Sequence, residues 1–261
     1  MKIKEVVDAL ERFAPLPLQE GFDNAGLQVG LTEAEVSGAL LCLDVTEKVV
    51  DEAVALGCNL IVSHHPLIFR ALKHITGEND VQRAVAKAIK KDITVVSMHT
   101  NFDNAKDGVN YKIAEKMELS DCGFFAEKTV DGISCGSGVI GTLPEAMAAD
   151  DFVLMLKRTF DVECVMCNQL LRRKISRVAI CGGAGSFLLD DAITAGADAF
   201  ITGEMHYHEY FGHEQEIQIA VIGHYQSEQF TNEIFESIIK EKCPGVKTYL
   251  TKTNTNPIIY L

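Results

Sequence analysis

The feature that most constrains this chain is an alternation of short, continuously apolar segments with amphipathic segments of helical periodicity. In the first half, apolar segments at 39–45, 59–63 and 92–98 are separated by such helical patterns. Strands that are apolar at every position are buried on both faces, so helices must cover both sides of their sheet. The sequence therefore predicts an α/β protein with mixed sheets flanked by helices.

The same alternation returns in the second half, where we expect strands at 177–183, 197–203 and 217–223. Helices are expected at 206–215 and 224–242, because apolar residues recur there at helical spacing. Between the halves, residues 127–167 contain glycines and alternating apolar residues. That pattern predicts antiparallel strands, with one helix near 150–160.

The two halves also resemble each other in sequence. DEAVALGCNLIVSHH can be set against DDAITAGADAFITGE, and VVSMHTNFD against AVIGHYQSE. In the second pair, each apolar strand is followed by a histidine, three residues and a carboxylate: His99 and Asp103, then His224 and Glu228. We therefore expect two related α/β lobes, at 1–125 and 126–261, which interdigitate in one structural unit. The second lobe includes the antiparallel segment.

Composition excludes several classes of protein. The net charge is −13, with 24 Lys and Arg against 37 Asp and Glu, which argues against nucleic acid as a partner. There is no signal peptide pattern and no apolar run of roughly 20 residues, so we expect a cytoplasmic protein without a membrane partner. We expect the eight cysteines to be reduced thiols. Cys164 and Cys167 form a single CxxC, which lacks the second pair that a structural zinc site needs.

The stretch IVSHHPLIF places two adjacent histidines, His64 and His65, at the end of a predicted strand. Neighbouring side chains in a strand point to opposite faces, so both rings can reach one partner only if the strand ends there, as the following proline favours. Alone, this pair is also compatible with a capped turn. Asp103, His224 and Glu228 likewise follow apolar strands, and ligands in open α/β sheets bind at the carboxyl ends of strands. Three imidazoles and two carboxylates are enough for a dinuclear divalent metal site, which we expect in the cleft between the lobes.

Other histidines are open to more than one interpretation. His99 is either a ligand or a residue that orients Asp103, and we favour the second. His206, His208 and His213 do not share one helix face, so a helix surface or cleft wall is favoured over a metal site. His74 is expected in a solvated loop. The stretch GGAGS at 182–186 is either a tight turn or a phosphate cradle.

Several of these motifs together resemble a known family. They are DNAGLQVG (23–30), LDVT (43–46), IVSHHPLIF (61–69), HTNFDN (99–104), CGGAGS (181–186), ITGE (201–204) and GHYQSE (223–228). The chain is similar to the GTP cyclohydrolase 1 type 2 homologues, also called Ngg-interacting factor three-like proteins. The family often has Trp where this chain has Phe22, and the chain resembles the short form without an inserted domain.

The resemblance implies a set of metal ligands and an assembly. The ligands fall on His64, His65, Asp103, His224 and Glu228, the last contacting both of two divalent ions per subunit. The implied assembly is a toroidal homohexamer with its metal sites facing an internal cavity. Imidazole with carboxylate suits Zn, Fe, Mn or Co, and the sequence does not choose among them.

Two functions follow as hypotheses. The first is a dinuclear metal-dependent hydrolase, GTP cyclohydrolase-like or a phosphoesterase, in which a metal-bound water is the catalytic group. Two divalent cations exceed the charge of two carboxylates, which suits an anionic small molecule such as a nucleotide. The alternative is a non-catalytic metal-binding scaffold or regulatory interaction protein.

Overall fold

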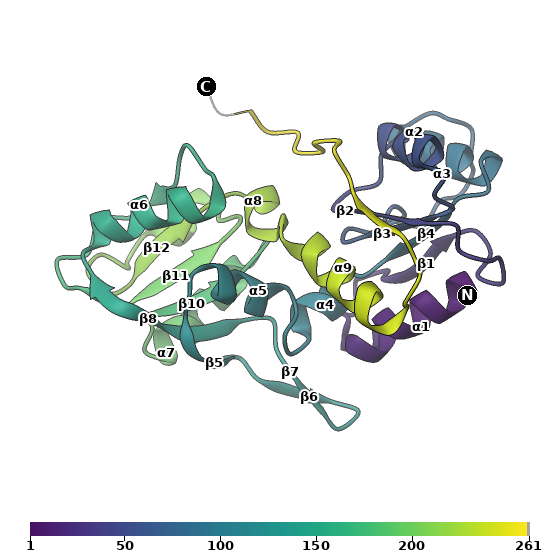
Figure 1. The fold of residues 1–261 in the computed structure, drawn as a ribbon. Helices are drawn as coiled ribbons and strands as arrows, with labels where there is room; N and C mark the ends of the chain where they lie inside the picture. The colour runs from purple at the N-terminus through teal and green to yellow at the C-terminus, as the bar shows by residue number, and fades with distance from the viewer. Residues whose placement is uncertain (260–261) are drawn as a thin grey trace. The chain divides into compact units, whose positions relative to one another are not determined.

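The computed structural model describes residues 1–259 and divides into two compact units (Figure 1). Unit 1 comprises residues 1–102 and 231–257, and unit 2 comprises residues 103–230 together with residues 258 and 259. This division differs from the expected lobes at 1–125 and 126–261. The difference arises because the helix at 231–242 belongs to unit 1 and the strand at 248–250 joins its sheet. The strand at 120–124, in turn, joins the sheet of unit 2.

Unit 1 is built on a five-stranded sheet in the order β1-β4-β3-β2-β13. Its strands are β1 (Gly26–Val29), β2 (Ala39–Cys42), β3 (Leu60–Ser63), β4 (Thr94–Ser97) and β13 (Thr248–Leu250). Strands β13, β2, β3 and β4 run parallel, and β1 is antiparallel to β4. The residues of β2, β3 and β4 are buried throughout, as their continuous apolar sequence predicts.

Helices cover the sheet of unit 1. They are α1 (Ile3–Phe13), α2 (Glu47–Leu56), α3 (Asp80–Lys90) and α9 (Thr231–Lys242), with a 3₁₀ turn η1 (Leu16–Leu18) after α1. Helices α2 and α3 pack on each other and share one core with Leu40, Ile61 and Val95, while α1 packs on α9. The expected caps of α2 are present: Thr46 accepts a hydrogen bond from the Val49 amide, and Gly57 adopts the left-handed conformation.

Unit 2 contains a six-stranded sheet in the order β5-β8-β10-β11-β12-β9. Its strands are β5 (Ser120–Phe124), β8 (Val139–Met147), β9 (Met166–Cys167), β10 (Ile175–Cys181), β11 (Ala199–Thr202) and β12 (Gln218–Val221). The hairpin β6 (Lys128–Val130) and β7 (Ile133–Cys135) stands apart from this sheet. The helical segments are α4 (Thr100–Asn104, which begins in unit 1), α5 (Val109–Lys116), α6 (Ala149–Phe160), η2 (Ser186–Leu188), α7 (Leu189–Thr194), η3 (Tyr207–Tyr210) and α8 (His224–Glu228).

The two sheets repeat one arrangement, which confirms the prediction of related mixed sheets flanked by helices. In unit 1, β2, β3 and β4 are parallel neighbours, with antiparallel β1 beside β4. In unit 2, β10, β11 and β12 are parallel neighbours, with antiparallel β9 beside β12. The predicted antiparallel segment and its helix are also present, as β6, β7, β8 and α6.

Two predicted helices were wrong. The segment 206–215 contains only the 3₁₀ turn η3, because Gly212 and Gln215 take positive φ angles that end regular helix. The segment 224–242 is two helices, α8 in unit 2 and α9 in unit 1. The side chain of Gln229 lies at the break and donates to the carbonyl oxygens of Gln226 and Phe160.

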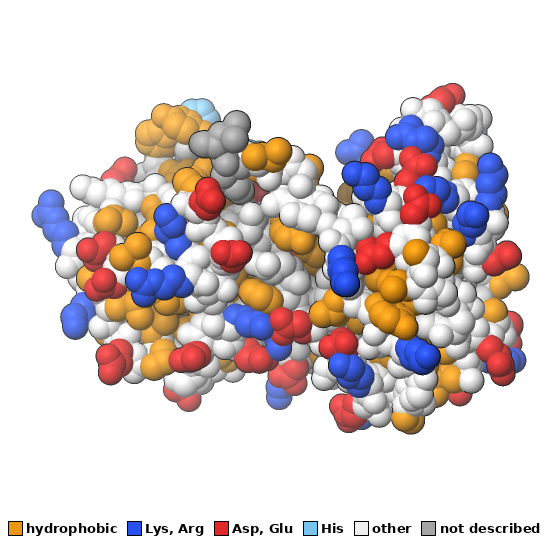
Figure 2. Space-filling view, turned by 45° about the horizontal axis from the view of Figure 1, so that its top comes forward, with side chains coloured by type: hydrophobic (Ala, Val, Ile, Leu, Met, Phe, Trp, Pro, Cys, Tyr) orange, Lys and Arg blue, Asp and Glu red, His pale blue; other side chains and the backbone are white. Residues whose placement is uncertain are grey.

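Surface charge agrees with the composition. The face visible in Figure 2 mixes Asp and Glu with Lys and Arg rather than gathering the basic side chains into one field. Among the helices of residues 1–259, none is both long and apolar enough to cross a membrane.

Candidate metal centre

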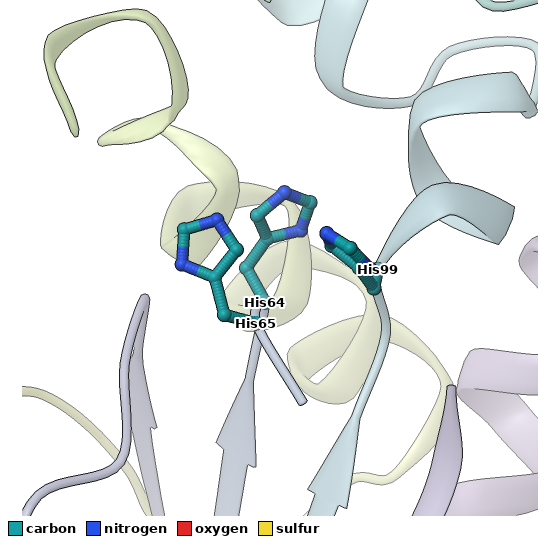
Figure 3. Close-up of side chains that lie close together, drawn as sticks. All are labelled: His64, His65 and His99. Carbon is teal, nitrogen blue, oxygen red and sulfur yellow. The ribbon is translucent and has the colours of Figure 1, made fainter. Parts of the chain in front are cut away.

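Three histidines of unit 1 gather at the carboxyl ends of two neighbouring parallel strands (Figure 3). His64 and His65 follow β3, and His99 follows β4. Ser63 and Ser97 are paired across the two strand ends, with their hydroxyl oxygens 2.8 Å apart. One ligand nitrogen from each ring lies within 4.8 Å of the others, so the three imidazoles could hold a metal ion.

The Nδ1 atom of each ring is fixed by an acceptor. His64 Nδ1 lies 2.9 Å from the carbonyl oxygen of Met98, His65 Nδ1 lies 2.8 Å from Asp44, and His99 Nδ1 lies 2.7 Å from Asp23. A carbonyl or carboxylate oxygen only accepts, so Nδ1 carries the proton and Nε2 carries the lone pair of the neutral ring. Acceptors of this kind set the tautomer and orientation of metal-binding histidines. The residues present therefore fit a divalent metal.

The two supporting carboxylates are themselves held in place. Asp44 accepts a 2.6 Å hydrogen bond from the hydroxyl of Thr255, near the C-terminus. Asp23 accepts from both the amide and the hydroxyl of Thr100. Burial opposes the charged form of Asp23, but the hydrogen bonds from His99 and Thr100 outweigh it and lower the pKa of Asp23 to about 2. The pKa of Asp44 is lowered in the same way, by His65 against the effect of burial.

Unit 2 fixes a histidine by the same means. His224 begins α8 after strand β12, and its Nδ1 lies 2.8 Å from an oxygen of Glu204, which follows β11. Its Nε2 lies 3.2 Å from the carboxylate of Glu228, one helical turn further on. The sequence prediction that His224 and Glu228 share one face of a helix is confirmed. Glu228 is buried.

The glycine-rich turn at 182–186 makes space for this carboxylate. Gly183 has a φ of +60°, and a Cβ atom there would lie 2.3 Å from Oε1 of Glu228 and 3.4 Å from Nε2 of His224. Its amide donates to the hydroxyl of Ser227, which in turn donates to the carbonyl oxygen of His224. The turn therefore lets the backbone approach Glu228, a role that the sequence pattern alone did not indicate.

Asp103 lies in the same part of unit 2. The side chain of Asn110 donates to the backbone carbonyl of Asp103 and accepts from the amide of Gly182, so it ties Asp103 to the glycine-rich turn. Burial, followed by the charges of Asp103 and Glu228, raises the pKa of the Cys181 thiol well above its usual value. The charges of Asp103 and Glu228 thus both raise the pKa of the same buried thiol.

The structure revises some residue roles. The sequence favoured His99 as a residue that orients Asp103, whereas its Nδ1 binds Asp23 and its ring joins His64 and His65. Asp23, Asp44 and Glu204, which fix three of the rings, were not predicted to have a role. The signal for them was present, because each lies in a motif already noted: DNAGLQVG, LDVT and ITGE.

The remaining candidates lie outside any ligand cluster of the described residues. His206 precedes the 3₁₀ turn η3, and His208 lies within it. The side chain of His213 pairs with Glu216. His74 is an exposed loop residue beside Glu78, as predicted. None of the eight cysteines forms a disulfide. Burial, with a contribution from Cys164, raises the pKa of Cys167 to about 11.

Fold and site together define an α/β protein with fixed histidines and carboxylates suited to a metal. A family model described as Duf34/NIF3 (NGG1p interacting factor 3) matches residues 1–257, and the chain belongs to this family. It is 35% identical to a "GTP cyclohydrolase 1 type 2 homolog" of Clostridium perfringens, over 87% of each chain. It is 32% identical to the Lactococcus lactis protein of that name, over 98% of each.

Solved structures agree with this assignment. A hypothetical protein of Staphylococcus aureus superposes with a TM-score of 0.92 at 27% identity, covering 100% of this chain and 99% of that one. A Bacillus cereus protein related to NIF3 superposes with a TM-score of 0.89 at 25% identity, with the same coverage. This chain therefore shares its α/β fold with solved proteins, one of which is described as related to NIF3.

Proposed function

We propose that this protein is a dinuclear metal-dependent hydrolase that acts on a nucleotide or another phosphate-bearing substrate. The proposed ligands are His64, His65, Asp103, His224 and Glu228. The observation that carries the proposal is that each of the three ligand histidines has its Nδ1 held by an acceptor, so that Nε2 is the ligand atom. Imidazoles held at Nδ1, with the buried carboxylate of Glu228 and the half-buried carboxylate of Asp103, form a donor set that suits Zn, Fe, Mn or Co.

The residues of the chain would have distinct tasks in this reaction. Asp44 and Glu204 would hold His65 and His224 in the neutral, metal-binding tautomer. Asp103 and Glu228 would neutralise only part of the charge of two cations, which leaves a positive site for an anionic substrate. When bound, the cations would supply Lewis acidity and would lower the pKa of water. The name of the relatives, GTP cyclohydrolase 1 type 2 homolog, supports a nucleotide as the substrate.

Metal content and turnover measured together test the proposal. Freshly purified wild type, His64→Ala and Glu228→Gln are compared by elemental analysis and by a panel of nucleotides and phosphoesters supplied with Mn, Fe, Zn or Mg. His74→Ala is the matched control, because His74 is an exposed histidine with a single carboxylate neighbour. We expect His64→Ala and Glu228→Gln to lose metal and turnover together, and His74→Ala to keep both. Turnover that survives in a metal-free variant would overturn the proposal.

The same panel addresses the alternative of a non-catalytic metal-binding scaffold or interaction protein, which the family description as an interacting factor supports. Wild-type rates that never exceed those of the ligand variants, in protein that still binds metal, would favour the scaffold. The toroidal homohexamer stays a prediction, and sedimentation equilibrium of the full chain measures it.

A further inference from the structure

Two large aromatic side chains of unit 1 stand in solvent beside the histidines. Phe22 is 69% exposed and Phe69 is 45% exposed, and their rings contact each other edge to face with centroids 6.4 Å apart. Other phenylalanines of the chain, such as Phe102 and Phe235, are fully buried. Contiguous exposed aromatic surface is unfavourable in water and marks a binding surface.

Hydrogen bonds hold the two loops that carry these rings. The side chain of Asn24 donates to the carbonyl oxygen of Ile68 at 2.6 Å, and the Gln28 side chain accepts from the Ile68 amide at 3.1 Å. Gln28 also donates to the carbonyl oxygen of Asn24. The residues that flank Phe22 and Phe69 are thus tied to each other. Exposed rings on a fixed backbone are preorganised for a ligand, because they lose little conformational entropy when the ligand binds.

The aromatic pair is continuous with the histidine cluster. The ring of Phe69 meets the ring of His99 edge to face, with centroids 6.0 Å apart, and His99 in turn contacts both His64 and His65. A planar group that rests on the pair is therefore next to the ligand nitrogens. The chain continues from Phe69 with exposed Arg70 and Lys73, in a protein of net charge −13.

We infer that Phe22 and Phe69 form a stacking platform for the nucleobase of the substrate, beside the metal ligands. The inference rests on the proposed function for its choice of ligand, a nucleotide. Aromatic side chains bind bases through their π faces, and removing one such contact weakens binding by about 5- to 150-fold. Every base has such a face, so the platform selects an aromatic ring rather than one particular base.

The chain has no tryptophan, so Phe22→Trp introduces a single fluorescent reporter at the platform. The family resemblance also indicates that Trp is tolerated at this position. The reporter protein is titrated with guanosine, which has a ring and no phosphate, and with ribose 5-phosphate, which has a phosphate and no base. Both titrations are run with and without added Mn²⁺, exciting the tryptophan where guanosine does not absorb.

We expect guanosine to quench the reporter with or without Mn²⁺, and ribose 5-phosphate to leave it unchanged. Adding Phe69→Ala to the reporter protein should weaken guanosine binding about 5- to 150-fold. Ile89→Ala is the matched control, because Ile89 is an exposed apolar residue of α3, and it should leave binding unchanged.

Failure of this inference is distinguishable from failure of the proposed function. If guanosine does not change the tryptophan fluorescence of a protein that still turns over a phosphoester, the stacking platform alone is overturned. Guanosine binding that depends on Phe69, in protein with no turnover, would support the platform and contradict the hydrolase. Tryptophan emission that shifts with protein concentration and not with guanosine would assign the surface to a second copy of the chain and overturn the inference.

Discussion

Replacing Gly183 with alanine tests whether the glycine-rich turn exists to make space for Glu228. A Cβ atom at this position would lie 2.3 Å from Oε1 of Glu228, whereas ordinary van der Waals contact begins at 3.4 Å. The carboxylate is the flexible end of its side chain, so we expect it to withdraw by about 1 Å rather than the backbone to move. Metal affinity should then fall by about 10- to 100-fold, the range seen when the support of a ligand is disturbed.

The substitution has a second cost that must be separated from the first. Gly183 has a positive φ, and an L-residue in that conformation costs about 1–2 kcal/mol of folding free energy. Gly196 is the matched control, because its φ is +74° and no heavy atom lies within 4 Å of a Cβ built there. Gly183→Ala and Gly196→Ala should therefore lose similar free energies of unfolding. Only the first should lose metal affinity.

Isothermal titration with Mn²⁺ or Zn²⁺ measures the affinity, and urea denaturation of the metal-free proteins measures the free energy of unfolding. If Gly183→Ala binds metal as tightly as Gly196→Ala does, the close approach to Glu228 has no role in the site. If it unfolds before metal can be added, Gly183→Asn and Gly196→Asn repeat the comparison, because Asn tolerates the left-handed conformation better than Ala and still carries a Cβ atom.

Three further predictions concern acid stability, the C-terminal segment and the thiols. Burial raises the pKa of Asp198, but hydrogen bonds from two backbone amides and an arginine outweigh burial, so the pKa is lowered overall. The charged carboxylate therefore stabilises the fold above about pH 4, and this stabilisation is lost as the pH falls. Asp198→Asn should lower the free energy of unfolding at pH 7, with a gap to wild type that narrows on acidification; parallel curves would contradict this. Thr255→Val should weaken metal binding about 10-fold through Asp44, while Thr255→Ser restores it; equal affinities in calorimetry would rule this out. A thiol reagent should modify exposed Cys164 fastest in native protein, and a fast phase that persists in Cys164→Ser would show the assignment to be wrong.

Much of the fold could be predicted from local patterns, because the signals for buried strands and capped helices are themselves local. The strands at 39–45, 59–63 and 92–98 and the caps Thr46 and Gly57 all belong to this group. The break between α8 and α9 could not be predicted from periodicity, because the helical pattern runs on through Gln229 while the chain passes from one unit to the other.

The candidate site shows the same limit. Histidines at strand ends are visible in sequence, so His64, His65 and His224 could be proposed as ligands. The residues that fix them are distant in sequence: Asp44 lies 21 residues before His65, and Asp23 lies 76 residues before His99. Pairing of this kind depends on which strands become neighbours, and spacing along the chain does not encode it.

The division of the chain has a consequence for the order in which the protein is made. Unit 2 is continuous from Asp103 to Phe230, whereas unit 1 needs α9 and β13 from the end of the chain. On the ribosome, the second unit can thus complete its sheet while the first still lacks an edge strand and the partner of α1, the reverse of the usual N-terminal-first order. Thr255, which donates to Asp44 behind His65, lies after β13 and is therefore made after all of these helices and strands. The hydrogen bond that holds Asp44, and through Asp44 the ring of His65, can therefore form only after residues 103–230 of unit 2 have been made.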